Sequence, residues 1–200
     1  GTSLAEQAVR ALGKQGEHAH PFAGQLGRIL LRRVGDIGSA PIADKRTRKA
    51  AVEVLGDMGE VGASESAALA FAMLYDPSDS VRYNAAWALG DLAEYSRFGN
   101  DELEAVRAAL QEDTDEDVRE AAARALGLMA AEDDDETAKV LRMALEDRSP
   151  GVRIAVAQSL GFIGNGSAYV FSALEEVARS KSETQDVIAA AMEALVNLEA

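Results

Sequence analysis

Two histidines and two acidic runs are the residues of this sequence whose types are best suited to binding a metal ion. His18 and His20 are separated by one residue, and two imidazoles at that spacing can in principle chelate one ion. Pro21 follows directly, so we expect both histidines in a solvated turn. The acidic runs 112–117 and 132–136 offer carboxylate oxygens but lack the loop with a central Gly on which helix-loop-helix Ca²⁺ sites are built. We therefore predict no metal site and no cofactor, and we expect these acids to cap helices.

Catalytic residues are not indicated by the rest of the sequence. The chain has no Cys, which excludes a thiolate nucleophile, a thiolate metal site and a disulfide framework. It shows no Ser-His-Asp arrangement, no phosphate-binding loop of the Walker type and no dinucleotide-binding fingerprint. We therefore predict that the protein is not an enzyme.

An Asp and an Arg six positions apart recur at the same register in three successive segments. The pairs are Asp76 with Arg82, Asp113 with Arg119, and Asp147 with Arg153. An Asp beside a helix N-terminus meets the positive end of the helix macrodipole, and a nearby guanidinium adds charge-assisted hydrogen bonds. A catalytic group is normally singular, whereas this pair repeats, so we predict a structural role for all six residues.

These pairs belong to a longer repeated segment. Residues 80–90, 117–127 and 151–161 share a Val-Arg start and a Leu-Gly end around an Ala-rich middle, with weaker copies over 4–13, 47–56 and 186–195. The closing positions lie 34 to 43 residues apart, which is the length of a helical hairpin. Numbered from the Val of Val-Arg as position 0, the copies are predominantly apolar at positions 0, 4, 7, 8 and 11, which form one face of a helix.

The periodicity predicts an all-α solenoid of about five to six stacked helical hairpins, as one domain over residues 1–200 and as a fragment or open-ended array. We expect the repeated segments to form B helices near 4–13, 47–58, 80–92, 117–129, 151–163 and 186–198. We expect A helices near 26–34, 67–75, 103–110, 138–145 and 170–178. The Gly at position 9 either tolerates a left-handed backbone or lets a neighbouring helix approach closely.

Composition and charge narrow the choice of partner. Only 5% of the residues are aromatic, which suits helices packed through Ala. The formal net charge is −14, and residues 61–200 alone carry −16, so nucleic acid and anionic membranes are disfavoured. No apolar run approaches the length of a membrane span, and we expect a soluble, cytoplasmic, acidic protein.

The Asp–Arg register and the Val-Arg to Leu-Gly core together resemble the HEAT repeat family, especially the short repeats of phycobilin lyase subunits. The resemblance covers nearly the whole chain. It implies a right-handed superhelix with B helices lining the concave side, and a ladder of Asp and Arg residues between neighbouring repeats. Ile42 stands opposite Arg48, and Ser182 opposite Ile188, so we expect this ladder to be weak at both ends.

The HEAT repeat family also includes enzymes, and the residues that two of these enzymes require are not found in this sequence. Deoxyhypusine hydroxylase holds iron with His-Glu pairs, whereas neither His18 nor His20 is followed by Glu. The HEAT-like DNA glycosylases use a cationic groove, which conflicts with the charge of residues 61–200.

Positions 2, 6 and 10 of each B helix point away from the apolar stripe and align as rows on one face. The three middle helices place large side chains there, and aromatic residues flanked by charge are typical of binding hot spots. The alternative is that Trp87 and Phe162 fold over neighbouring helices as packing. The predicted partner-binding residues are Tyr83, Trp87, Asp91, Arg124, Leu128, Ile154, Gln158 and Phe162.

A basic stretch near residues 28–49 is a rival binding zone. It contains Arg28, Arg32, Arg33, Lys45, Arg46, Arg48 and Lys49. This stretch could dock an acidic segment, nucleic acid or the acidic half of the chain itself. The alternative is that it forms an ordinary exposed turn with no binding role.

We therefore predict a protein-interaction scaffold or adaptor that binds a partner segment on the concave face of the B helices. One alternative is an accessory subunit of an enzyme of the phycobilin-lyase kind. Another is a regulatory repeat segment of a larger signalling protein.

Overall fold

All regular secondary structure in the described part of the chain is helical. The structure is a computed structural model, and it describes residues 3–31, 43–131, 134–163 and 168–199. The chain divides into two compact units, residues 1–105 and residues 106–200, which we describe separately. None of the helices in the described ranges combines the length and apolarity that crossing a bilayer requires.

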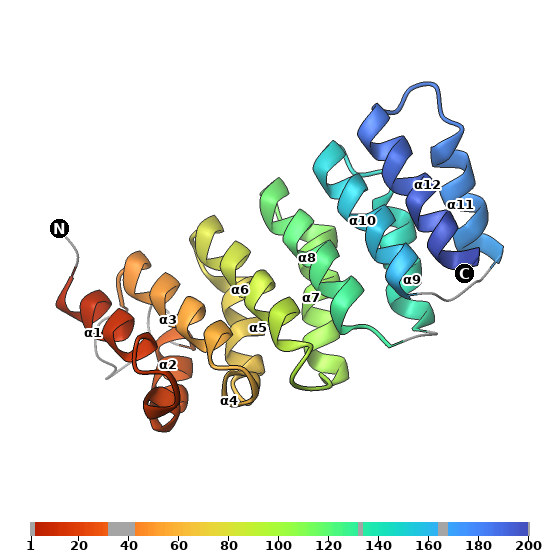
Figure 1. Cartoon of the computed structure of the whole chain (residues 1–200). Helices are drawn as coiled ribbons and strands as arrows, with labels where there is room; N and C mark the ends of the chain where they lie inside the picture. The colour runs from red at the N-terminus through yellow and green to blue at the C-terminus, as the bar shows by residue number, and fades with distance from the viewer. Residues whose placement is uncertain (1–2, 32–42, 132–133, 164–167, 200) are drawn as a thin grey trace. The chain divides into compact units, whose positions relative to one another are not determined.

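The N-terminal unit contains three B helices and the A helices that cover them (Figure 1). Helix α3 packs between α1 and α6, while α2 and α5 pack against α3 and α6 as the second layer. The B helices are α1 (Leu4–Gly13), α3 (Lys45–Asp57) and α6 (Asp79–Leu92). The other elements are η1 (Gly16–Phe22), α2 (Ala23–Leu30), α4 (Glu60–Ala63), α5 (Ser66–Tyr75) and the start of α7 (Asn100–Glu112).

The C-terminal unit repeats the same arrangement. Helix α10 (Pro150–Ile163) packs between α8 (Glu116–Met129) and α12 (Gln185–Glu199), and the A helices are α9 (Asp135–Ala144) and α11 (Ala168–Ala178). Across both units the six B helices begin and end within two residues of the expected bounds. The all-α repeat architecture is therefore confirmed, and a single solenoid over residues 1–200 stays a prediction.

Two local features differ from the expected pattern. The A helix predicted over 26–34 is instead α2, which begins at Ala23 and ends at Leu30, and residues 32–34 lie outside the described residues. The short elements η1 and α4 were not predicted, because segments of their length carry no measurable helical periodicity.

Acidic side chains begin several of these helices, as predicted for the acidic runs. Asp115 accepts hydrogen bonds from the backbone N–H groups of Asp117 and Val118 at the start of α8. Asp134 accepts one from Thr137 at the start of α9. A carboxylate in this place satisfies helix N–H groups that have no intrahelical partner and faces the positive end of the macrodipole.

The Gly at position 9 of the B helices allows close approach between helices. A Cβ built on Gly161 would lie 2.8 Å from the Cα of Ala194, and one built on Gly127 would lie 2.7 Å from the Oγ of Ser159. In each case the neighbour occupies position 7 of the next B helix; the other such contacts are Gly13 with Val54 and Gly56 with Ala88. Among the described glycines only Gly16 and Gly59 have positive φ, so the left-handed alternative is wrong for this motif.

The repeated Arg binds two repeats at once. In the C-terminal unit, Arg119 donates to both carboxylate oxygens of Asp147, from Nε at 2.7 Å and from Nη2 at 2.9 Å. Its Nη1 donates to the backbone carbonyl of Asp113 at 3.0 Å. The Asp six residues earlier thus offers its carbonyl, while the carboxylate comes from the following repeat. Arg82 likewise donates to the carbonyl of Asp76, and Arg153 to that of Asp147.

The expectation that this ladder weakens at both ends is wrong. Arg48 forms a buried two-bond pair with Asp76, at 2.6 and 2.7 Å. Arg153 donates from Nε and Nη2 to Glu183 at 3.1 and 2.7 Å. The carboxylate that binds each Arg lies 28 to 30 residues ahead in the sequence, so Ile42, which lies outside the described residues, does not decide the pairing of Arg48, and Glu183 takes the place that Ser182 cannot fill for Arg153.

Candidate functional site

The outward face of α6 carries the aromatic part of the predicted site. Tyr83 and Trp87 are one helical turn apart, and their ring centroids lie 6.2 Å apart in an edge-to-face arrangement. Trp87 is 36% exposed, while Tyr83 is half-buried. Asp91 follows on the same face and is exposed. The rings therefore support each other and still present aromatic surface to solvent.

A second carboxylate, Asp57, joins this face from the neighbouring helix α3. Gly56 lies so close to Ala88 that a Cβ on it would be 3.2 Å from the Ala88 Cβ, which brings the two helix faces together beside Trp87. Asp57 and Asp91 have no hydrogen bond or ion pair within the described residues. Partial loss of hydration around its carboxyl group, followed by the negative charge of Asp57, raises the pKa of Asp91.

We expect Asp91→Asn to raise the melting temperature at neutral pH. A carboxyl group whose pKa is raised in the folded state destabilises that state when ionised, and the amide removes this penalty. The stability gained by Asp91→Asn is therefore present at pH 7. It shrinks as the pH falls through the raised pKa of Asp91 and vanishes below the ordinary pKa of 3.8. Thermal unfolding followed by circular dichroism at several pH values measures it; a lower melting temperature at pH 7 would contradict the assignment.

The predicted residues of the C-terminal unit form a second exposed group. Leu128 on α8 is 55% exposed and Phe162 on α10 is 67% exposed. Because most of the Phe162 side chain is exposed, packing over a neighbouring helix does not account for it. Ile154 and Gln158 are half-buried on α10, and Arg124 forms an ion pair of 2.8 Å with Glu120 one turn earlier on α8.

The predicted set is therefore divided between the two units. Tyr83, Trp87 and Asp91 lie together in the N-terminal unit, and the remaining five lie in the C-terminal unit on adjacent helices. Sequence reasoning missed Asp57 and Tyr95 beside the first group. Tyr95 is exposed, and its ring contacts the backbone position of Gly59, just past the end of α3. The available signal for Asp57 was that position 10 is Asp in two successive B helices.

The basic stretch is largely occupied by intramolecular partners. Arg48 is buried against Asp76, Lys49 pairs with Glu53 at 3.6 Å, and Lys45 lies 3.8 Å from Asp79. Arg32 and Arg33 lie outside the described residues. These contacts favour a structural role for this stretch over a docking zone.

The two histidines lie in η1, where His18 is exposed and His20 is half-buried. Within the described ranges no three side chains of His, Asp or Glu gather in a way that could hold a metal ion.

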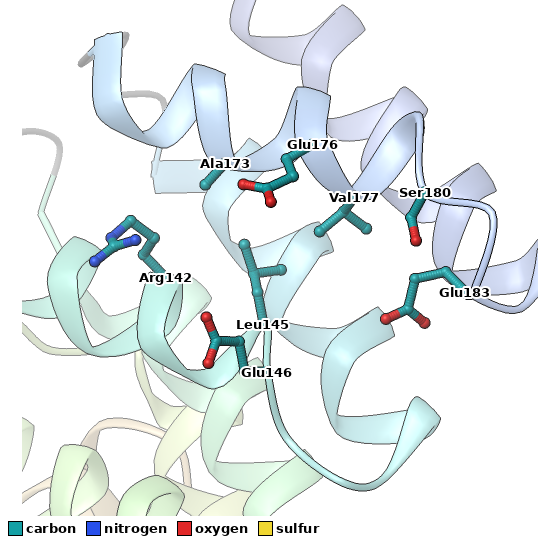
Figure 2. Close-up of a pocket in the computed structure, with 8 residues that line it drawn as sticks. All are labelled: Arg142, Leu145, Glu146, Ala173, Glu176, Val177, Ser180 and Glu183. Carbon is teal, nitrogen blue, oxygen red and sulfur yellow. The ribbon is translucent and has the colours of Figure 1, made fainter.

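A hollow of about 210 Å³ lies between the A helices α9 and α11 of the C-terminal unit (Figure 2). Its walls carry one guanidinium, from Arg142, and three carboxylates, from Glu146, Glu176 and Glu183. The Glu183 carboxylate is bound by Arg153. The predicted binding residues do not line this hollow, so it plays no part in the candidate site.

Comparisons with known proteins agree on the fold. Residues 42–127 and 103–196 match the family model for HEAT repeats. An engineered protein of known crystal structure is similar, with a TM-score of 0.63, 20% identity, and coverage of 97% of this chain and 90% of that one. The complex of CpcE and CpcF of phycocyanin lyase from Nostoc sp. PCC7120 is also similar, with a TM-score of 0.61 and 19% identity over 87% of this chain and 98% of that one.

Two further structures show the same fold. A designed armadillo repeat protein has a TM-score of 0.58 at 18% identity, covering 96% of this chain and 92% of that one. Human deoxyhypusine hydroxylase has a TM-score of 0.53 at 19% identity, covering 98% and 79%. No curated protein matches this chain in sequence.

Proposed function

Because the chain belongs to the HEAT repeat family, we propose that it is a non-catalytic, cytoplasmic scaffold or adaptor that binds a partner protein segment on the outward face of its B helices. The observation that carries this proposal is the exposure of Trp87, Leu128 and Phe162. All three lie at positions 6 or 10 of a B helix, Trp87 in the N-terminal unit and Leu128 and Phe162 in the C-terminal unit. Most of the other residues at positions 2, 6 and 10 of the B helices are polar or small.

The physical basis is the combination of rigid helices and large side chains. Within its unit, each B helix packs on at least one other B helix, and α3 and α10 pack between two, so their outward side chains have fixed positions. Aromatic and large apolar residues on a fixed surface supply contact area at a small cost in conformational entropy, and they dominate binding free energy in many interfaces. Repeat proteins commonly use such extended surfaces for binding.

We expect the variant Tyr83→Ala, Trp87→Ala, Phe162→Ala to lose a partner that the unchanged chain captures. The measurement is affinity capture from a lysate of the source organism, followed by mass spectrometry. Truncation of hot-spot residues costs about 2 kcal/mol or more each, which is roughly a thirtyfold loss of affinity per residue. Circular dichroism must show that the variant remains folded.

A matched control removes three exposed large side chains from the A helices instead. Tyr75→Ala, Met143→Ala, Tyr169→Ala changes α5, α9 and α11, whose residues at these positions are all exposed. This control should capture the same partner as the unchanged chain. If both variants captured the partner equally well, the B-helix face would not be the binding surface.

A second candidate function is supported by the similarity to phycocyanin lyase. That structure is a complex of two chains, so a protein of this fold can act as one subunit of an enzyme. For this chain, the corresponding role would be an accessory subunit that binds an open-chain tetrapyrrole. A shift of tetrapyrrole absorbance on mixing, together with quenching of Trp87, would favour this role over the scaffold.

A further inference from the structure

We propose that the C-terminal ends of α3 and α6 bind basic side chains, so that the partner segment held on the B-helix face carries Lys or Arg at this point. The inference rests on the proposed function and specifies the chemistry of the partner. The surface consists of Tyr83, Trp87 and Asp91 on α6, Asp57 on α3, and Tyr95 after α6, and we call it the acidic-aromatic patch.

Both carboxylates of the patch lie where the fold itself disfavours negative charge. Asp57 is the last residue of α3, and Asp91 is the last but one of α6. A helix C-terminus carries partial negative charge, so a carboxylate there is repelled and a cation is attracted. Neither helix has a basic residue in its last turn. The two acids therefore add to the negative potential of the helix ends.

Two other acids close in sequence to this patch, Glu53 on α3 and Asp76 before α6, already have intramolecular partners. Glu53, one turn before Asp57 on the same face, binds Arg10 at 3.1 Å and Lys49 at 3.6 Å. Asp76 is bound by Arg48. Asp57 and Asp91 differ, since within the described residues neither has a cation within ion-pair distance. An external cation would therefore gain two carboxylate contacts without breaking a pair.

The backbone holds the two carboxylates beside aromatic rings. Close packing of Gly56 against Ala88 fixes α3 against α6, with Trp87 and Asp57 as the adjoining residues. Gly59 adopts a φ of 56°, and its missing side chain leaves the space in which the Tyr95 ring lies. Rings and carboxylates are thus presented by elements that pack directly on each other.

This combination fits a Lys or Arg side chain better than a metal ion. A cation over an aromatic face is attracted by the ring, and the apolar stem of Lys or Arg can lie along the same ring. A metal site would need a third ligand, and the described residues supply no group of three. The exposure of Trp87 and Tyr95 suits a long side chain arriving from outside.

The test uses the full chain and a short peptide of alternating Lys and Arg, with a Glu and Gln peptide of equal length as the probe of opposite charge. Trp87 is the only tryptophan, so its fluorescence reports directly on the patch. We expect a saturable emission change with the basic peptide and none with the acidic one. Asp57→Asn with Asp91→Asn should weaken binding by at least about tenfold, a loss of about 1.4 kcal/mol.

A charge-matched control separates a site from diffuse attraction by an acidic protein. Asp101→Asn with Glu104→Gln removes the same charge from an exposed face of α7 and should change the affinity less than about twofold. Equal weakening by both double variants would overturn the proposal, and so would an unchanged Trp87 emission. If the partner is neutral or acidic, the alanine variant would still lose it in the capture experiment, while the basic peptide would not bind the patch. The two proposals can therefore fail separately.

Discussion

We expect Arg48→Ala to destabilise the N-terminal unit by about 3 to 5 kcal/mol, the range for breaking a buried ion pair from one side. The side chains of Arg48 and Asp76 are only 9% and 4% exposed. Without the guanidinium, the Asp76 carboxylate would remain buried with the backbone N–H of Ser78 as its remaining donor. Arg48 also donates to the Ala43 carbonyl at 2.7 Å, and that bond would be lost as well.

Urea unfolding followed by the fluorescence of Trp87 measures this loss, since Trp87 lies in the same unit. Lys49→Ala is the control in the same unit, because Lys49 forms a partly exposed i, i+4 pair with Glu53 on α3. Exposed pairs of this kind contribute about 0.3 to 0.5 kcal/mol. A midpoint for Arg48→Ala that stays as close to the unchanged chain as that of Lys49→Ala would show that the ladder pair contributes no stability.

Some contacts of the ladder could be predicted from this sequence, and others could not. The recurring Asp and Arg correctly indicated a repeated structural contact. The resemblance implied a ladder between neighbouring repeats, and Asp147 of the next repeat does supply the carboxylate to Arg119. The spacing of six residues instead reflects a bond within the repeat, from Arg119 to the Asp113 carbonyl. Burial alone would raise the pKa of Asp147, yet the bonds from Arg119 and the Ser149 N–H outweigh it and lower that pKa.

The helices themselves were predictable because their periodicity extends over ten or more residues. Leu at position 8 is buried in four of the six B helices, at Leu55, Leu89, Leu126 and Leu160. The partners of the charged residues were harder to predict, since they depend on which repeat stacks on which. Glu183 illustrates this, because it stands one residue after the position that aligns with the ladder Asp and still binds Arg153.

The candidate site was predicted as a face and not as a set of contacts. Of the predicted residues, Trp87, Asp91, Leu128 and Phe162 at positions 6 and 10 are exposed, whereas Tyr83 and Ile154 at position 2 are half-buried. Asp57 was placed in a row of its own helix, and its relation to Asp91 follows only from the close packing at Gly56. One-dimensional periodicity gives the face of each helix, whereas the lateral neighbours come from the depth to which adjacent helices interlock.

That interlocking leads to the second large expected effect, from Gly161→Ala. A Cβ at residue 161 would lie 2.8 Å from the Cα and 3.0 Å from the Cβ of Ala194 on α12. The nearest atom belongs to the backbone, so a rotamer change cannot relieve the clash and α10 must separate from α12. We expect a loss of about 1 to 3 kcal/mol, the usual cost of overpacking, despite the higher helix propensity of Ala.

Gly24→Ala provides the matched control for this substitution. Gly24 lies in α2, and the nearest atom to its added Cβ would be the Glu65 Oε1 at 3.4 Å, an ordinary contact. Ala at this position should leave stability unchanged or raise it by up to about 1 kcal/mol, because Ala is the better helix former. Thermal unfolding followed by circular dichroism compares the two variants. If both changed the melting temperature in the same direction and by the same amount, helix propensity would explain the result and the close approach of α10 and α12 would not matter to stability.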